Sequence, residues 1–240
     1  MFQRSEKVPH TVARAIVSDV MQSHLPPGST LQSEGEMMAR YQVSRGSLRE
    51  ALRILEVLGF ITMKPGPKGG PMLLEADSSQ LASIATLYYQ RLNATYEEIL
   101  QLRLTLERDA ALNAARCRSP EQIDELNRYI EMSRSMDLTN DREFSQVGQG
   151  FHDLVARVAG NRVSTLVIRS CFDVFKGKTN DYLYPVSERP KVAKVHEQIA
   201  MSIIDGQPAV AQAMMNDHLQ DYLTQALARY SIFLHENVTW

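Results

Sequence analysis

The sequence predicts a mainly α-helical protein in two parts: a small N-terminal domain that ends in a β-hairpin, and a larger C-terminal bundle made of helices. Residues 31–59 have the pattern of two short helices joined by a tight turn. Residues 60–74 have the composition of two strands around a Gly/Pro-rich turn. From residue 79 to residue 235, helical patterns follow one another without an alternating Val/Ile/Thr-rich run between them.

The N-terminal part begins with a helix expected over Thr11–His24. The segment Leu25-Pro-Pro-Gly28 ends it, because proline cannot continue a helix. Ser33 and Glu36 have the spacing of a capping box and start a second helix. Ser44 is the expected cap of a third helix. Apolar residues spaced i, i+3, i+4, i+7 predict one buried face on this third helix: Leu48, Ala51, Leu52 and Leu55.

A second face of the third helix carries Arg45, Arg49 and Arg53, which recur every four residues. A short helix with a buried leucine face and an arginine stripe suits the DNA major groove, where guanidinium groups pair with guanine or phosphate. The alternative is a solvated helix face, which arginines at this spacing often form. The expected hairpin, with lysines in its turn at residues 64–70, favours DNA binding. Together these elements predict a winged helix-turn-helix with a small β-hairpin wing.

The remaining chain is expected to fold as an all-α bundle of about 155 residues. The predicted domains are residues 1–75 and 81–235, with a linker at residues 76–80. The helices expected in the bundle are residues 79–91, 95–116, 120–136, 141–158, 162–176, 191–205 and 208–235.

Composition and charge limit the classes of protein that fit. The chain has 240 residues, of which 44% are hydrophobic and 22% charged, as in ordinary globular proteins. Its two cysteines lack a C-x-x-C spacing, which fits a reducing cytoplasm better than a disulfide framework. Residues 1–70 hold nine Lys/Arg and six Asp/Glu, a net charge of +3, which leaves −5 for residues 71–240. A mildly basic N-terminal domain on an acidic body is consistent with one domain facing DNA.

Two sets of polar residues in the bundle are candidates for ligand binding. His152, His196 and His218 fall on three separate predicted helices, and neutral imidazoles that converge in a bundle bind ions such as Zn or Ni. The alternative is that the three histidines are hydrogen-bonded or exposed. Arg103 lies in a largely apolar helix, where it could clamp a carboxylate or form a structural salt bridge with Glu107 at i+4. Four aromatic residues at helical spacing are expected in the core: Tyr88, Tyr89, Phe172 and Phe175.

The N-terminal part resembles the DNA-binding domain of the GntR family of bacterial transcription regulators. The residues that carry this resemblance are Leu25-Pro-Pro-Gly28, Leu31-Gln-Ser-Glu34, Val43-Ser-Arg45, Leu48-Arg-Glu-Ala-Leu52 and Leu55-Glu56 through Gly59. It implies that Arg45 and Arg49 contact the operator, with Ser44 and Ser47 as hydroxyl partners. The resemblance also places Gly66 and Lys68 at the wing tip, which reaches the minor groove or the flanking backbone.

The C-terminal part is similar to the ligand-binding domain of the FadR subfamily within GntR, known as the FCD domain. The matching residues are Leu102-Arg103 through Glu107 with Ala114-Ala115, Phe151-His152 through Ala159-Gly-Asn161, His196-Glu197 through Asp205-Gly206, and Ala213-Met214 through His218. The resemblance implies a dimer whose bundle holds a small effector, commonly an organic acid. It also implies that His152, His196 and His218 match the metal ligands of metal-dependent FCD domains. Gly148 stands where those relatives usually have a fourth ligand, an aspartate.

The sequence therefore predicts a DNA-binding transcription regulator, expected to repress metabolic genes by binding operator DNA as a homodimer under the control of an organic acid. One alternative is a metal-responsive regulator without an organic effector. Another is a three-histidine metalloenzyme, which is disfavoured because the sequence has no His-Glu-x-x-His run to supply a general base. We expect a cytoplasmic protein without enzymatic activity. We expect no membrane partner, because no apolar run approaches the length of a membrane span.

Overall fold

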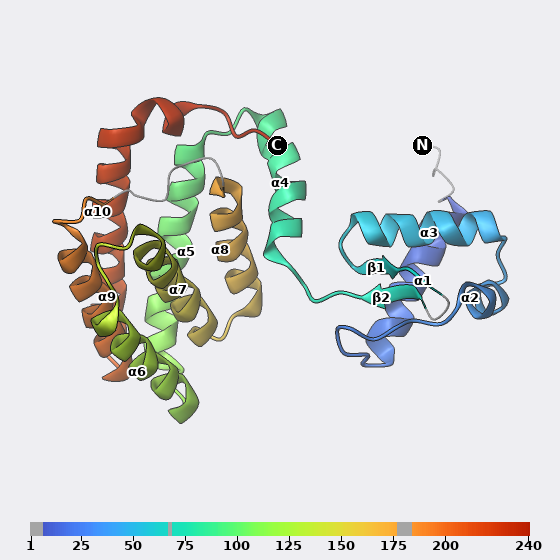
Figure 1. Ribbon diagram of the computed structural model, residues 1–240, viewed down its shortest axis with the longest axis horizontal. Helices are drawn as coiled ribbons and strands as arrows, with labels where there is room; N and C mark the ends of the chain where they lie inside the picture. Colours follow the sequence, from blue (N-terminus) through green and yellow to red (C-terminus); the bar gives the residue numbers. More distant parts are fainter. Residues whose placement is uncertain (1–6, 67–68, 177–183) are drawn as a thin grey trace. The chain divides into compact units, whose positions relative to one another are not determined.

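The computed structural model describes residues 7–66, 69–176 and 184–240. The chain divides into two compact units, Met1–Gln80 and Leu81–Trp240. The first unit contains α1 (Val8–Gln22), α2 (Glu34–Tyr41) and α3 (Arg45–Val57), followed by the strands β1 (Ile61–Lys64) and β2 (Gly70–Leu73) (Figure 1). The two strands pair antiparallel and form the predicted wing.

Local capping and one apolar core explain the helices of the first unit. The hydroxyl of Ser33 accepts a hydrogen bond from the Glu36 N–H, and the Glu36 carboxylate accepts one from the Ser33 N–H, so the predicted capping box is confirmed. Ser44 caps α3 by accepting from the Ser47 N–H. The core includes the predicted leucine face of α3 and joins it to α1, α2 and the wing: Val12, Ala13, Ile16, Val20, Met37, Leu48, Ala51, Leu52, Leu55, Ile61 and Leu73.

The second unit is a helical bundle in which α5 is the central helix. Helix α10 lies along α5, and α7, α8 and α9 also pack against it. The described helices of this unit are α4 (Ser78–Leu92), α5 (Tyr96–Arg116), α6 (Pro120–Ser135), α7 (Asp141–Val158), α8 (Arg162–Phe175), α9 (Arg189–Ile204) and α10 (Pro208–His235) (Figure 1). None of the described helices is long and apolar enough to cross a membrane.

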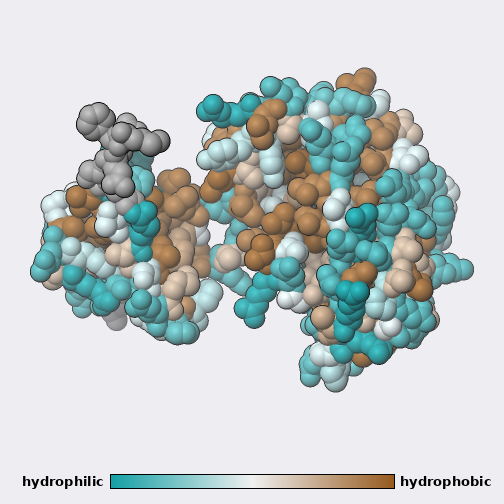
Figure 2. Space-filling model, turned by 180° about the vertical axis from the view of Figure 1, so that it is seen from behind, coloured by the Kyte–Doolittle hydropathy of each residue, from teal (hydrophilic) through white to brown (hydrophobic). Residues whose placement is uncertain are grey.

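Helix α4 is more exposed to solvent than the other described helices of the bundle. It buries only Ala82 and Thr86, whereas Leu87, Tyr88 and Leu92 are 44%, 66% and 74% exposed. The prediction that Tyr88 lies in the core is therefore wrong. Figure 2 shows that apolar side chains gather on the surface of the second unit.

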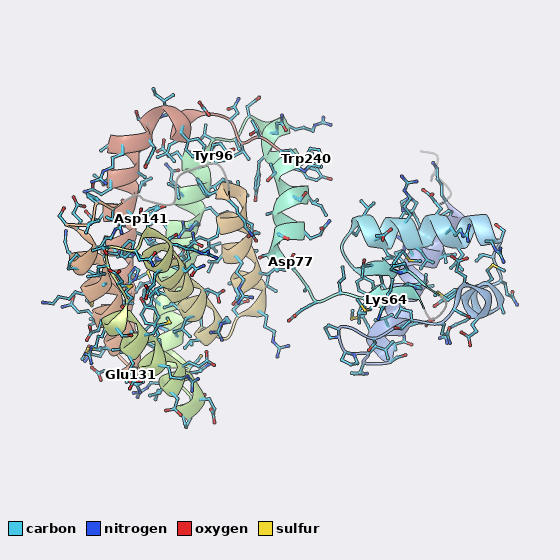
Figure 3. The ribbon with its side chains drawn as sticks, viewed as in Figure 1. Lys64, Asp77, Tyr96, Glu131, Asp141 and Trp240 are labelled. Carbon is cyan, nitrogen blue, oxygen red and sulfur yellow. The ribbon has the colours of Figure 1, made fainter. Side chains whose placement is uncertain are left out.

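The C-terminal end of the chain folds back onto the start of the bundle. Helix α10 is kinked at Tyr230, whose backbone is non-helical. Beyond α10, the Val238 N–H donates to the Ala94 carbonyl at 2.8 Å, and the Trp240 indole N–H donates to the Ser83 hydroxyl at 3.1 Å. Tyr96 and Trp240, both labelled in Figure 3, mark the region that this tail covers.

The predicted fold class, mainly α with a winged helix-turn-helix and an all-α bundle, is confirmed. Helices 141–158 and 208–235 have the expected bounds, and the other helix ends that were expected differ by up to three residues. Helix α4 begins at Ser78, inside the segment expected to be a linker, and the second unit continues beyond residue 235 to Trp240. The Asp77 carboxylate accepts a hydrogen bond from the Ser79 N–H at the start of α4, and the contacts of Val238 and Trp240 with Ala94 and Ser83 join the last residues to the second unit.

Candidate functional site

Three histidines from three helices meet in the interior of the bundle. His152 lies on α7, His196 on α9 and His218 on α10, and all three are buried. The Nε2 atoms of His196 and His218 are 3.0 Å apart, and those of His218 and His152 are 3.4 Å apart. One ligand atom from each ring lies within 4.8 Å of the other two. The structure thus brings together the three histidines that the sequence singled out.

The outer nitrogen atoms of two of these rings contact other buried side chains. The Nδ1 of His152 lies 2.5 Å from Oε2 of Glu107, and the Nδ1 of His196 lies 3.2 Å from the Tyr129 hydroxyl. A carboxylate at Nδ1 favours the tautomer in which Nδ1 carries the proton and the Nε2 lone pair faces the cluster. Phe151 stacks on His196 with the ring centroids 4.3 Å apart. These contacts hold the rings in the orientation that points Nε2 inward.

Burial and mutual repulsion keep two of the imidazoles neutral. The pKa of His196 lies well below its ordinary value because the ring is buried, with His218 and His152 as secondary causes. Burial also lowers the pKa of His218 to about 3, and the neighbouring His152 adds to the effect. Neutral imidazole is the form that binds metal ions, so no proton has to leave these two rings at neutral pH.

Arg103 and Glu107 form a buried ion pair beside the histidines. Nε of Arg103 donates to Oε1 of Glu107 at 2.8 Å, and both side chains are almost fully buried. Burial alone would raise the pKa of Glu107, but Arg103 and His152 outweigh it and lower the pKa to about 2. The salt bridge considered from the sequence is therefore present. The Arg103 guanidinium also lies 3.7 Å from the ring centre of Phe172, an arrangement that favours a cation.

The donor set fits a metal ion in number and in chemistry. For an ion bound at 2.0–2.1 Å in tetrahedral geometry, ligand nitrogens are about 3.3 Å apart. Two of the three separations in the cluster, 3.0 and 3.4 Å, are close to this value, and all three are within 4.8 Å. Gly148 on α7 supplies no fourth ligand. A Cβ built at Gly148 would have His196 Cε1, 4.0 Å away, as its nearest neighbour, so this position faces the cluster across open space.

The histidine cluster forms part of the wall of a cavity of about 320 Å³ inside the bundle. This volume lies in the range of small-molecule sites. The cavity is lined by Leu100, Arg103, Phe144, Ser145, Gly148, Gln149, His152, Phe172, Asp173, Phe175, Lys176, Tyr184, Val192, His196, His218, Tyr222, Ala226, Tyr230, Phe233 and Leu234.

Sequence reasoning missed several polar groups of this site. Glu107 was considered only as a partner of Arg103, because its contact with His152 depends on how α5 and α7 pack. Tyr129 and Tyr184 gave no motif signal, although both are buried tyrosines with a hydroxyl at or near the site. The hydroxyl of Tyr184 is buried and has no hydrogen-bond partner among the described residues.

The first unit presents the other candidate interface on α3 and the wing. Arg45, Arg49 and Arg53 are exposed, and Arg49 is 3.2 Å from a carboxylate oxygen of Glu34. The hydroxyls of the expected contact residues Ser44 and Ser47 lie 3.1 Å apart at the start of α3. At the wing, Gly66 has a φ of +109°, which favours glycine, and its carbonyl accepts a hydrogen bond from the Gly69 N–H at 2.8 Å. Lys68 lies outside the described residues.

Comparison with known protein families identifies both parts of the chain. Residues 10–67 match the family described as bacterial regulatory proteins, gntR family, and residues 98–221 match the FCD domain. The second match alone covers about half of the chain.

Similar proteins are found among transcription regulators. The HTH-type transcriptional regulator YcbG of Bacillus subtilis is 29% identical over 212 residues, which span 87% of this chain and 85% of the relative. LutR of Bacillus subtilis is 25% identical over 83% of this chain and 92% of its own length. The repressor NanR of Escherichia coli is 29% identical over 66% of this chain and 60% of its own length. A structure of Streptococcus agalactiae GntR has the same fold, with a TM-score of 0.71 over 91% of this chain and all of that one, at 19% identity.

Proposed function

Since this chain belongs to the GntR family of bacterial regulatory proteins and carries an FCD domain, it is a DNA-binding transcription regulator, and we propose that it is a repressor controlled by an organic acid. In this proposal it represses metabolic genes in the cytoplasm and acts as a regulator rather than as an enzyme. The observation that carries the effector part is the cavity of about 320 Å³ beside three buried histidines and a buried arginine. An ion alone would not need a cavity of this size, which favours an organic effector over a sensor of metal only.

The exposed arginines of α3 support direct contact with the operator. A helix-turn-helix places the N-terminal residues of its recognition helix against base edges in the major groove. Arg45 and Arg49 are in the first turns of α3 and point away from its buried leucine face. We propose that these two residues contact the operator, that Ser44 and Ser47 assist them, and that the wing around Gly66 and Lys68 contacts the flanking DNA.

The geometry of the cluster supports a divalent ion such as Zn or Ni on His152, His196 and His218. When bound, the ion would supply a positive centre that attracts an anion. Glu107 and Tyr129 would orient two of the ligand rings. Glu107, the carboxylate in contact with His152, is already balanced by Arg103, so it does not compensate the charge of the ion. An organic acid would provide that charge, and Arg103 could bind its carboxylate.

A homodimer is the form expected to bind a palindromic operator. Helix-turn-helix dimers place two recognition helices in successive major grooves, so the symmetry of the protein matches that of the DNA. The exposed apolar residues of α4 support self-association, because a large apolar patch on a folded surface commonly marks an interface. We propose that α4 forms part of it.

The test is titration of DNA from upstream of its own gene, followed by fluorescence anisotropy, with random DNA of equal length as reference. We expect the purified protein to prefer the upstream DNA. Substituting Arg45→Ala should weaken binding by about 1–3 kcal/mol, the value of a bidentate base contact. Arg128→Ala, an exposed arginine on α6, is the matched control and should leave binding unchanged. Equal affinity for both DNAs would contradict sequence-specific regulation.

A further inference from the structure

The side chains that line the cavity change from polar to apolar along α10. His218, Tyr222 and Ala226 all line it and follow one another at intervals of four residues, so they lie on one face of the helix. At 1.5 Å per residue, His218 and Ala226 are separated by about 12 Å along the axis. Leu234, further along the same helix, also lines the cavity. The wall therefore runs from an imidazole, through a tyrosine, to apolar side chains.

The central helix α5 shows the same change from polar to apolar residues, which we call the gradient of the cavity. Glu107 contacts the histidine cluster, Arg103 lies one turn away from it, and Leu100 lies nearly one turn further. Tyr96, at the start of α5, stacks on Phe233 of α10 with the ring centroids 4.3 Å apart. The ends of α5 and α10 that are remote from the histidines thus meet in an apolar, aromatic region.

Helix α8 contributes aromatic rings along the same cavity. Phe172 lies against Arg103 and is 6.0 Å from His152, measured between ring centres. Phe175, about one turn further along α8, is 5.5 Å from Tyr96. The aromatic rings of Phe172 and Phe175 thus continue from the histidine end toward Tyr96, while Asp173 and Lys176 of the same stretch also lie on the cavity wall. The polar-to-apolar change is therefore carried by α5 and α10.

The polar end has donors suited to a single carboxylate. Among the described hydrogen bonds, Arg103 uses Nε toward Glu107, and its terminal nitrogens remain for a ligand. Tyr184 lines the cavity, and its buried hydroxyl has no partner in the part of the chain that the structure describes. Its ring centre lies 6.2 Å from that of Tyr222, which in turn is near Arg103. A buried hydroxyl without a partner is costly unless a ligand satisfies it.

From this arrangement we propose that the ligand is an amphipathic carboxylic acid. Its carboxylate binds at Arg103, Tyr184 and the histidine end, and its apolar body, an aliphatic chain or aromatic ring of several carbons, extends toward Leu100 and Ala226. The proposal rests on the function above and narrows the effector class. A two- or three-carbon acid would leave most of the 320 Å³ filled with water, since one water occupies about 30 Å³ in the liquid.

The test is calorimetric titration of the full-length protein, with zinc present and absent, against acetate, butanoate, hexanoate, octanoate and 3-phenylpropanoate. Lactate and hexanamide complete the set as a short hydroxy acid and an uncharged analogue. We expect affinity to rise about fourfold per methylene, the value of a buried CH₂, until the chain fills the apolar end. The amide should bind at least tenfold more weakly than hexanoate.

A variant tests where the aliphatic chain of the acid lies within the cavity. Ala226→Leu narrows the apolar end, and it should weaken hexanoate and octanoate at least tenfold while leaving butanoate within about twofold. Ala228→Leu, at an exposed position on the same helix, is the matched control and should leave the series unchanged. The wild-type series keeps the proposal testable if Ala226→Leu does not fold.

Two results would overturn the proposal in different ways. If acetate, lactate and butanoate bind and longer acids gain nothing, the cavity takes an organic acid but not an amphipathic one, and the proposed function stands. If no acid of any length binds, or if hexanamide binds as well as hexanoate, the organic-acid effector is wrong as well.

Discussion

At the scale of single residues, Gly148 decides how a metal ion would be held. Helix α7 passes the histidine cluster at this residue without offering a side chain. Three neutral nitrogen ligands leave the charge of a divalent ion uncompensated, and a buried charge without a counter-charge is unfavourable. The site as built therefore favours joint binding of the ion and an anion.

Adding the missing carboxylate should make metal binding independent of an anion. In Gly148→Asp, the described atom nearest to the new Cβ outside its own stretch of helix would be His196 Cε1 at 4.0 Å, so the side chain fits and can reach the cluster. We expect zinc affinity to rise by about tenfold or more, given that even outer partners of a metal site are worth 10- to 100-fold. Competition with a chromogenic chelator measures this, and an organic acid should then add little to the affinity.

Gly150→Asp is the matched control for that substitution. It makes the same chemical change two residues further along α7, at an exposed position with no atom within 4 Å of the new Cβ. Its zinc affinity should equal that of the wild type. Equal affinities for both variants and the wild type would place the ion away from the three histidines.

The buried histidines also predict how the stability of the metal-free protein depends on pH. Folding lowers the pKa of His218 to about 3 and that of His196 well below its ordinary value. Below a pH of about 6.5, the unfolded chain takes up protons on these rings and the folded chain does not, so the free energy of unfolding falls as the pH drops. Between pH 7.0 and 5.5 each ring should lower the free energy of unfolding by about 1.3 kcal/mol, or by about 2.5 kcal/mol for the two.

Urea unfolding of the second unit within the full-length protein, followed at pH 7.0 and 5.5 in the presence of a chelator, measures this difference. His218→Gln should remove about half of it. His10→Gln, an exposed histidine on α1, should leave it unchanged. A free energy of unfolding that does not change between the two pH values would show that both rings titrate normally.

At the scale of secondary-structure elements, the sequence predicted most of what local patterns encode. Helices α7 and α10 have the expected bounds because residues at or next to their starts mark them: Asn140 caps α7, and Pro208 occupies the first position of α10. The wing was expected from strand composition around a Gly/Pro-rich turn. The kink at Tyr230 was not, since no proline or glycine lies near it in α10.

Contacts between distant elements explain the features that the sequence did not predict. Helical spacing showed that the three histidines lie on separate helices, but the contact of Glu107 with His152 depends on the packing of α5 against α7. The gradient of the cavity likewise exists only once α5 and α10 lie together. Tyr88 shows the opposite error: its pattern resembled that of a core residue, yet its side chain is 66% exposed. An apolar residue on a helix can face an interface instead of the core of its own unit.

At the scale of the whole molecule, the exposed apolar face of α4 bears on how the regulator would act. An operator with two half-sites is bound tightly only when two DNA-binding units are linked, because the second contact then becomes intramolecular. Helix α4 leads out of the DNA-binding unit and into the bundle, and it carries Leu87, Tyr88 and Leu92 on its exposed side. A dimer contact on α4 would connect the oligomeric state directly to the spacing of the two DNA-binding units.

This connection predicts that weakening the contact on α4 weakens operator binding without touching a DNA-contacting residue. Tyr88→Glu places a charge among exposed apolar side chains, where it costs nothing in a monomer and is unfavourable in a dry interface. We expect sedimentation at micromolar concentration to show a dimer for the wild type and a monomer for Tyr88→Glu, with operator affinity reduced at least tenfold. Met132→Glu, at an exposed apolar residue of α6, is the control and should remain dimeric. If Tyr88→Glu remains a dimer with unchanged affinity, α4 is not the interface; if it is monomeric and still binds the operator tightly, the two DNA-binding units act independently and the palindromic arrangement is wrong.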